Sequence, residues 1–123
     1  MKSICVYAGS AAGTKEVFTN NAIELGNAIA NYNYSMVYGG GSNGLMGVVA
    51  NAALSNGAEV TGIITEQLDE IEVGHKGLTK LEVVSSMHKR KARMAELSEA
   101  IISLPGGVGT WEELFEALAL SLI

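Results

Sequence analysis

Cysteine, histidine and long apolar runs are scarce in this sequence of 123 residues. The single cysteine, Cys5, excludes an intramolecular disulfide and favours a reducing compartment, and its apolar neighbours indicate a small core residue rather than a nucleophile. The two histidines lie far apart, which disfavours a dedicated zinc site. No apolar run approaches the ~20 residues of a membrane span, and the first residues are typical of a strand, not of a signal peptide. These absences predict a cytoplasmic protein that binds neither a metal nor a membrane.

Positive charge is also scarce, and it is unevenly placed. The net charge of −5 disfavours general binding to nucleic acids or to anionic membranes. Half of the eight basic residues lie within five positions, at Lys89, Arg90, Lys91 and Arg93. An acidic chain with one such basic cluster suits a small anionic ligand better than a polyanion.

The order of apolar segments predicts an α/β fold. Strands are predicted at 2–8, 35–38, 60–65, 81–84 and 100–104, with helical patterns between them and a partly helical stretch at 66–80. Strands alternate with helices along a single domain, residues 1–123. We therefore expect a Rossmann-like, doubly wound parallel sheet of about five βα units, with helices on both faces. In such sheets ligands bind at the carboxyl ends of the strands.

Capping residues mark the expected helix ends. Thr14 is a candidate N-cap for the first helix, and Ser85 or Ser86 for a helix that reaches about Glu99. A further helix is predicted from about Asn43 to Ser55, with Asn56-Gly57 as its stop.

A glycine-rich segment follows the last predicted strand. Residues 104–113 read Leu-Pro-Gly-Gly-Val-Gly-Thr-Trp-Glu-Glu and open a helical pattern. Glycines at a strand-to-helix junction leave backbone N–H groups uncovered, and the helix adds the positive end of its dipole, so the segment predicts a phosphate site. Thr110 and Glu113 also fit a capping box. That structural role is compatible with a Glu113 carboxylate that faces the sugar of a nucleotide.

A second glycine cluster follows the second predicted strand. Residues 39–44, Gly-Gly-Gly-Ser-Asn-Gly, fit the GxGxxG pattern. In dinucleotide-binding folds this motif follows the first strand, with an acidic residue about 20 positions further on. Glu66 could take that part, but it lies 27 positions after Gly39. A nicotinamide dehydrogenase, or glycines with a purely structural role, are therefore alternatives to one nucleotide crevice lined by both clusters.

Arg90 departs from the pattern of its helix. It shares one helical stripe with Met87, Met94 and Leu97, and this stripe should face the sheet. An arginine on that stripe indicates a functional guanidinium, and a structural salt bridge at the sheet's edge is the alternative.

Some neighbours of Arg90 are expected to face solvent, and others have two possible roles. His88 and Lys89 are expected to face outward, whereas Lys91 and Arg93 either join the basic cluster or are solvated. The methionines Met46 and Met87 either stack on an aromatic base or pack in the core.

Three motifs together resemble the LONELY GUY (LOG) family: Gly39-Gly40-Gly41 with Gly44-Leu45-Met46-Gly47, then Ser86-Met87-His88-Lys89-Arg90-Lys91, and last Pro105-Gly106-Gly107-Val108-Gly109-Thr110 with Glu113. Members of this family are cytokinin riboside 5′-monophosphate phosphoribohydrolases, often mislabelled as lysine decarboxylases. The resemblance runs from the first strand to the last residue. The combination of PGGxGTxxE with MHxRK is far more specific than either glycine cluster alone.

The resemblance implies a Rossmann-like fold, usually in a homodimer, that hydrolyses the N-glycosidic bond of AMP or an N6-modified AMP. The products are the free base and ribose 5-phosphate, and the reaction needs neither a cofactor nor a metal. The catalytic pair falls on Arg90 and Glu113. The substrate-binding positions fall on Gly9, Ser10, Gly39, Gly40, Gly41, Met87, Lys91, Gly106, Gly107, Gly109 and Thr110.

The residue types suit this chemistry. Glycosidic cleavage passes through an oxocarbenium-like state that a carboxylate such as Glu113 stabilises. Arg90 could stabilise charge on the departing purine or hold the substrate. A lysine decarboxylase is disfavoured because no lysine lies in a recognisable pyridoxal phosphate motif. The main alternative is a non-catalytic protein that carries a nucleotide or the molybdenum cofactor, because carriers of that cofactor are similar in fold and glycine turns.

The last residues, Leu122 and Ile123, are apolar and carry no helix stop signal. Members of the family continue past this point with further strands and a helix. We therefore expect either a shortened form of the family domain or a partner that covers this end.

Overall fold

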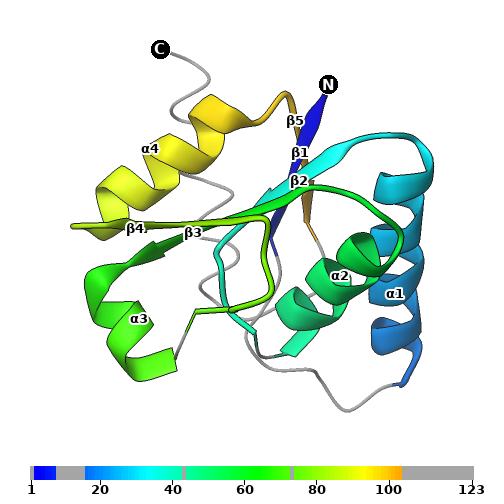
Figure 1. Ribbon diagram of the computed structural model, residues 1–123, viewed down its shortest axis with the longest axis horizontal. Coiled ribbons are helices and arrows are strands. Elements are labelled where there is room, and N and C mark those ends of the chain that lie inside the picture. The colour runs from blue at the N-terminus through cyan, green and yellow to red at the C-terminus, as the bar shows by residue number, and fades with distance from the viewer. Residues whose placement is uncertain (1, 8–15, 43, 73, 104–123) are drawn as a thin grey trace.

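A computed structural model describes residues 2–7, 16–42, 44–72 and 74–103 of the chain (Figure 1). The elements alternate as predicted, and the described ends of the strands lie within one residue of the predicted ones. The predicted Thr14 cap and the helix expected after residue 110 lie outside the described residues. In chain order the elements are β1 (Ser3–Tyr7), α1 (Glu16–Asn31), β2 (Ser35–Tyr38), α2 (Gly44–Ser55), β3 (Val60–Thr65), α3 (Glu66–Glu72), β4 (Lys80–Val84), α4 (Met87–Leu97) and β5 (Ala100–Ser103).

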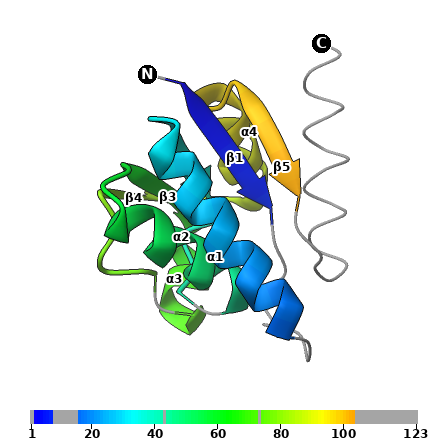
Figure 2. The same ribbon diagram turned by 90° about the vertical axis from the view of Figure 1, so that its right-hand side faces the viewer.

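The five described strands form one parallel sheet in the order β4-β3-β2-β1-β5. This order confirms the Rossmann-like expectation. From β1 the chain first adds β2, β3 and β4 on one side, and then crosses to place β5 on the other side, next to β1 (Figure 2). The strand order therefore switches between β1 and β5, where open α/β sheets form their ligand crevice.

Helices cover both faces of the sheet, which confirms the doubly wound arrangement (Figure 1). On one face α1 and α2 pack against each other and enclose the larger apolar cluster, which includes Ile29, Met36 and Val49. On the other face Met94 of α4 packs against a smaller cluster from β1, β2 and β3. Cys5 belongs to this smaller cluster and is fully buried, as predicted for a core residue.

Local signals end α2 and begin α4 as expected. The N–H of Gly57, which has φ 89°, donates to the Leu54 carbonyl (3.0 Å), and the N–H of Ala58 donates to the Ala53 carbonyl (3.0 Å). These two bonds satisfy carbonyls that the helix end leaves unpaired. Ser86, not Ser85, is the N-cap of α4.

Two features are absent from the part of the chain that the structure describes. Its helices are too short or too polar to cross a membrane. Its His, Cys, Asp and Glu side chains form no group of three or more that could hold a metal ion.

Gly26 lets α1 approach α2 closely. A Cβ atom at this position would lie 2.6 Å from the Cβ of Ala52 and 2.6 Å from the carbonyl oxygen of Val49. Neither neighbour is the end of a flexible side chain, so a methyl group would push the two helices apart.

We predict that Gly26→Ala destabilises the fold. Helix propensity alone favours alanine by about 1 kcal/mol, but overpacking costs about 1–3 kcal/mol, so the free energy of unfolding should fall. Urea denaturation followed by circular dichroism measures it. Asn21→Ala, at an exposed position of α1, is the control and should be neutral or stabilising. A more stable Gly26→Ala protein would contradict the close packing of α1 on α2.

Arg93 ties α4 to the edge strand β4. Its Nε and Nη2 donate to the two carboxylate oxygens of Glu82 (2.9 and 3.0 Å), and Lys80 Nζ lies 3.4 Å from the same carboxylate. The Arg93 hydrogen bonds hold the pKa of Glu82 below its ordinary value, although partial burial opposes this shift.

We predict that the Glu82 pair stabilises the protein at neutral pH and not in acid. Because the folded-state pKa is lowered, the stabilisation is complete above the ordinary glutamate pKa and is lost as pH falls through the folded-state value. Glu82→Gln should therefore lower Tm modestly at pH 7, and by progressively less as the pH falls below the ordinary glutamate pKa. The matched control is Glu96→Gln, since Glu96 is much more exposed and meets Arg93 through one bond. A Tm difference between Glu82→Gln and the parent that does not change with pH would contradict this.

Candidate active site

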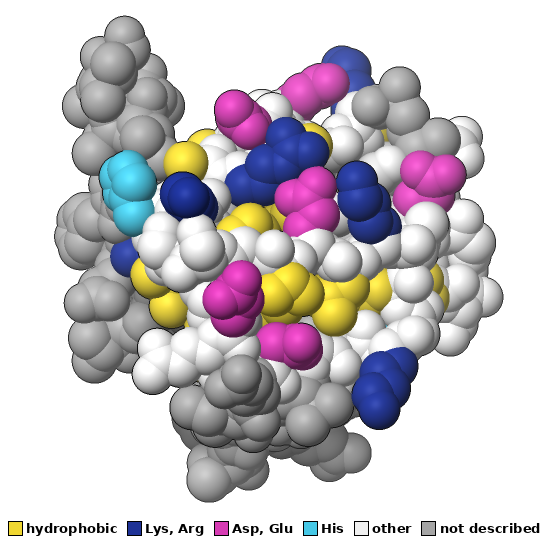
Figure 3. All heavy atoms as spheres, turned by 60° about the vertical axis from the view of Figure 1, so that its left-hand side comes forward, with side chains coloured by type: hydrophobic (Ala, Val, Ile, Leu, Met, Phe, Trp, Pro, Cys, Tyr) yellow, Lys and Arg dark blue, Asp and Glu magenta, His cyan; other side chains and the backbone are white. Residues whose placement is uncertain are grey.

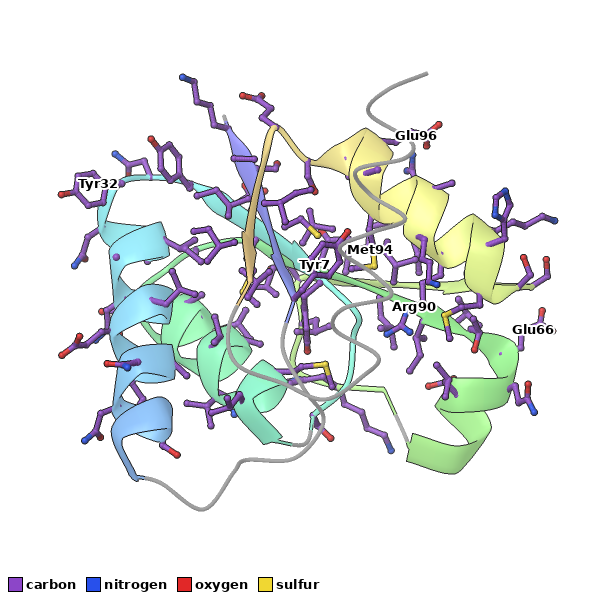
Figure 4. The ribbon with its side chains drawn as sticks, turned by 180° about the vertical axis from the view of Figure 1, so that it is seen from behind. Tyr7, Tyr32, Glu66, Arg90, Met94 and Glu96 are labelled. Carbon is purple, nitrogen blue, oxygen red and sulfur yellow. The ribbon has the colours of Figure 1, made fainter. Side chains whose placement is uncertain are left out.

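Arg90 lies on α4, and Ser86 sets where this helix begins. Ser86 has an extended backbone (φ −151°, ψ 159°), and its Oγ accepts the N–H of Lys89 (3.2 Å). Arg90 and Met94, four residues apart, then share the face of α4 that packs on the sheet, and both are buried. Figure 4 shows both side chains extending from α4 toward the sheet, whereas Glu96 points away from it. The predicted inward placement of Arg90 is confirmed.

The Arg90 guanidinium occupies a gap beyond the end of β2. Pairing between β2 and β3 stops at Gly62, whereas β3 stays paired with β4 to its last residue. Arg90 Nε donates to the Ile63 carbonyl (2.7 Å), and Nη2 donates to the Gly39 carbonyl (2.7 Å). The side chain thus joins two inner strands where their own pairing has ended. Arg90 therefore does not lie at the sheet's edge, where the alternative prediction of a structural salt bridge placed it.

The partners of the guanidinium among the described residues are neutral groups. Arg90 is 8% exposed, and burying a cation is costly unless its N–H groups are bonded. Two carbonyls bond two of these groups, and Nη1 lies 3.4 Å from the Sδ of Met87. A fixed cation at the carboxyl ends of parallel strands suits an anionic ligand, or negative charge that develops during a reaction.

Gly39 provides the space for this guanidinium. A Cβ atom at Gly39 would collide with Arg90 Nη2. Any side chain at this position would therefore displace the guanidinium from the carbonyl that binds it. The role of Gly39 is therefore to let the backbone come close to the Arg90 side chain.

The turn of residues 39–41 is held by three different parts of the chain. Its first carbonyl accepts from Arg90, as described above. The second accepts from the backbone N–H of His75 (2.9 Å), and the third accepts from the hydroxyl of Tyr38 (2.7 Å). Each peptide of the turn thus has its orientation fixed by the surrounding protein.

The loop before β4 fastens this turn to α2 through His75. His75 Nδ1 accepts the N–H of Gly77 (3.0 Å), so Nε2 carries the ring proton and donates to Asn51 Oδ1 (2.7 Å). An antiparallel bridge also joins Gly41 to Gly74. Neither Tyr38 nor His75 was predicted as a site residue from the sequence. Tyr38 stands three positions before Gly41, which is a turn spacing, but His75 contacts the turn from far along the chain and carries no local signal.

The basic cluster is divided by the fold. Arg90 is buried at the strand ends, whereas Arg93 pairs with Glu82 and Lys89 Nζ donates to Ser85 Oγ (3.0 Å). On the face that carries α4, Lys and Arg side chains alternate with Asp and Glu instead of forming one basic patch (Figure 3). His88 and Lys89 are exposed, as predicted, and Lys91 is half-buried.

The two methionines lie differently from each other. Met87 is 41% exposed, so the expectation that it faces inward is wrong. A helical side chain covers the turn before its own Cα, and Met87 is the first residue of α4 with no such turn before it. Met46 packs against the larger core cluster, which agrees with its core role.

The remaining predicted site residues lie outside the described residues: Gly9, Ser10, Gly106, Gly107, Gly109, Thr110 and Glu113. The strands that precede them are described. β1 leads toward Gly9 and β5 toward Gly106, and the two strands are parallel neighbours. Because β2 is the other neighbour of β1, the chain leaves three adjacent strands at the same end of the sheet.

Known proteins similar to this chain carry related names. A sequence profile of the family described as "Possible lysine decarboxylase" matches residues 46–123. A cytokinin riboside 5′-monophosphate phosphoribohydrolase from Rhodococcoides fascians is 50% identical over 121 residues, which cover 98% of this chain and 61% of that protein. Another from Arabidopsis thaliana is 45% identical over 117 residues, covering 95% of this chain and 55% of that protein. The chain therefore spans little more than half the length of these relatives.

Solved structures share the fold. The molybdenum cofactor carrier protein from Chlamydomonas reinhardtii superposes with a TM-score of 0.83 at 23% identity, over 98% of this chain and 72% of that one. The matching profile, the two relatives and the predicted motifs lead to one assignment. The chain belongs to the LONELY GUY (LOG) family, the family whose profile is described as "Possible lysine decarboxylase".

Proposed function

We propose that this chain hydrolyses the N-glycosidic bond of AMP or of an N6-modified AMP such as a cytokinin riboside 5′-monophosphate. Water adds across the bond between the ribose and the base, which releases the free base and ribose 5-phosphate. The observation that carries the proposal is the buried Arg90 guanidinium, bonded to Ile63 and Gly39 at the strand ends. Family membership supports it, since the relatives are named for this reaction.

Arg90 and Glu113 are the proposed catalytic pair. The reacting sugar develops positive charge, which the Glu113 carboxylate would stabilise while it positions water. Arg90 would stabilise negative charge on the departing purine or hold the nucleotide against Glu113. Because two carbonyls already fix the guanidinium, it would need little reorganisation when the reaction begins.

The other proposed contacts divide between the phosphate and the base. Gly106, Gly107, Gly109 and Thr110 would bind the phosphate through backbone N–H groups at a helix start. Met87 is exposed beside Arg90 and could contact the base. Gly9, Ser10, Lys91 and the turn of residues 39–41 would complete the site. We further propose a cytoplasmic homodimer that needs no cofactor or metal.

Binding without turnover is the second candidate. The likeness to a protein named as a molybdenum cofactor carrier favours it, although that likeness concerns the fold. Incubation of the protein with AMP, followed by chromatography for adenine, separates the two. Release of adenine supports the enzyme, whereas retention of nucleotide without release supports the carrier.

We predict that Glu113→Gln lowers base release by at least about 100-fold, because it removes the charge that opposes the oxocarbenium ion. Nucleotide affinity should change little, and calorimetry measures it alongside the chromatographic assay. Glu96→Gln, at an exposed position on α4, is the matched control. Full activity of Glu113→Gln would remove Glu113 from the mechanism.

We predict that Arg90→Lys also lowers turnover by about 100-fold or more, although the positive charge is kept. An ammonium group lacks the planar fork of a guanidinium, so it cannot bond the Ile63 and Gly39 carbonyls in the same geometry. Arg93→Lys, on the same helix, should leave kcat unchanged. Turnover by Arg90→Lys equal to that of the parent protein would show that charge alone suffices.

A further inference from the structure

Tyr38 is a buried tyrosine whose hydroxyl bonds within the glycine turn. Its side chain is 0% exposed, and its hydroxyl donates to the Gly41 carbonyl (2.7 Å), three residues along the chain. Burial raises the pKa of Tyr38 well above its ordinary value. The hydroxyl therefore keeps its proton and acts as a donor across the whole working pH range.

The same short turn holds Arg90. Gly39, whose carbonyl accepts from Arg90 Nη2, lies between Tyr38 and Gly41 in the chain. The Tyr38 hydroxyl closes the turn around Gly39 from the core side by binding the Gly41 carbonyl, and the backbone N–H of His75 binds the Gly40 carbonyl. The position of the Gly39 carbonyl thus depends on both bonds, and the position of the guanidinium depends on that carbonyl.

We propose that Tyr38 is a positioning residue for Arg90: its hydroxyl fixes the glycine turn so that the Gly39 carbonyl holds the guanidinium. The hydroxyl itself takes no part in the chemistry. This inference rests on the proposed function where it concerns turnover, but its structural half can be tested without any activity.

Hydrogen exchange at the arginine side chains provides that test. The sequence contains two arginines, Arg90 and Arg93, so a proton–nitrogen NMR spectrum of the full chain should contain two arginine Nε–H signals. Arg90→Lys assigns them. In Tyr38→Phe the Gly39 carbonyl that accepts from Arg90 Nη2 is no longer fixed. The planar guanidinium should then turn away more often from the Ile63 carbonyl, to which Nε donates, so exchange at Arg90 Nε–H should become at least tenfold faster while exchange at Arg93 stays the same.

Tyr34→Phe is the matched control. Tyr34 packs at the edge of the core and stacks on Tyr32, away from the turn. In Tyr34→Phe the exchange rates of both arginine Nε–H groups should equal those of the parent protein. A third variant carries a 4-amino group on the ring at position 38, in place of the tyrosine hydroxyl. This amino group is again a hydrogen-bond donor, so it should restore slow exchange at Arg90. If Tyr38→Phe fails to fold, this amino form is compared directly with the parent, and fast exchange at Arg90 in a folded amino form would overturn the proposal.

Kinetics with AMP give the second readout. Tyr38→Phe should lower kcat about tenfold, since it displaces Arg90 from its place in the proposed site. A tyrosine that only filled the core would lower Tm and leave both kcat and the Arg90 exchange unchanged, and that result would overturn the proposal. If the parent protein releases no adenine but Tyr38→Phe still speeds exchange at Arg90, the positioning role stands and the proposed function fails.

Discussion

The burial of one guanidinium between two strand ends is the constraint on which the described site depends. Moving a cation out of water is costly, and Arg90 meets that cost with the carbonyls of Ile63 and Gly39. This solution requires that β2 stop before β3, so that the Ile63 carbonyl is available to a side chain. It also requires a glycine at position 39, since a Cβ there would meet the guanidinium.

Several elements that look unrelated in the sequence serve this one contact. The Ser86 cap sets the register of α4, and so places Arg90 over the sheet. Tyr38 and His75 fix the two carbonyls that follow Gly39. A side chain held in this way by bonded neighbours is pre-organised, and pre-organised groups lose little free energy when they meet a developing charge.

The fold also explains why the GxGxxG spacing need not indicate a dinucleotide site. The motif follows β2, whereas the strand order switches at β1. Its first glycine makes room for Arg90, and its last, Gly44, begins α2 with φ 63°. The pattern is thus satisfied by a side-chain contact and a helix start. Membership of the LOG family agrees with this, because the motif was specific only in combination with the segments at 86–91 and 105–113.

Local patterns in the sequence were sufficient to predict the strands, the Ser86 cap region, the stop at Gly57 and the inward placement of Arg90. All of these depend on residues within a turn or two of each other. The Glu113 partner and the phosphate turn stay predictions. Only the tertiary structure decided that Arg90 binds carbonyls 27 and 51 positions away, that Met87 is exposed, and that His75 reaches the glycine turn. The physical reason is that strand order and the unequal lengths of neighbouring strands determine which backbone groups remain unpaired, and neither is encoded in local periodicity.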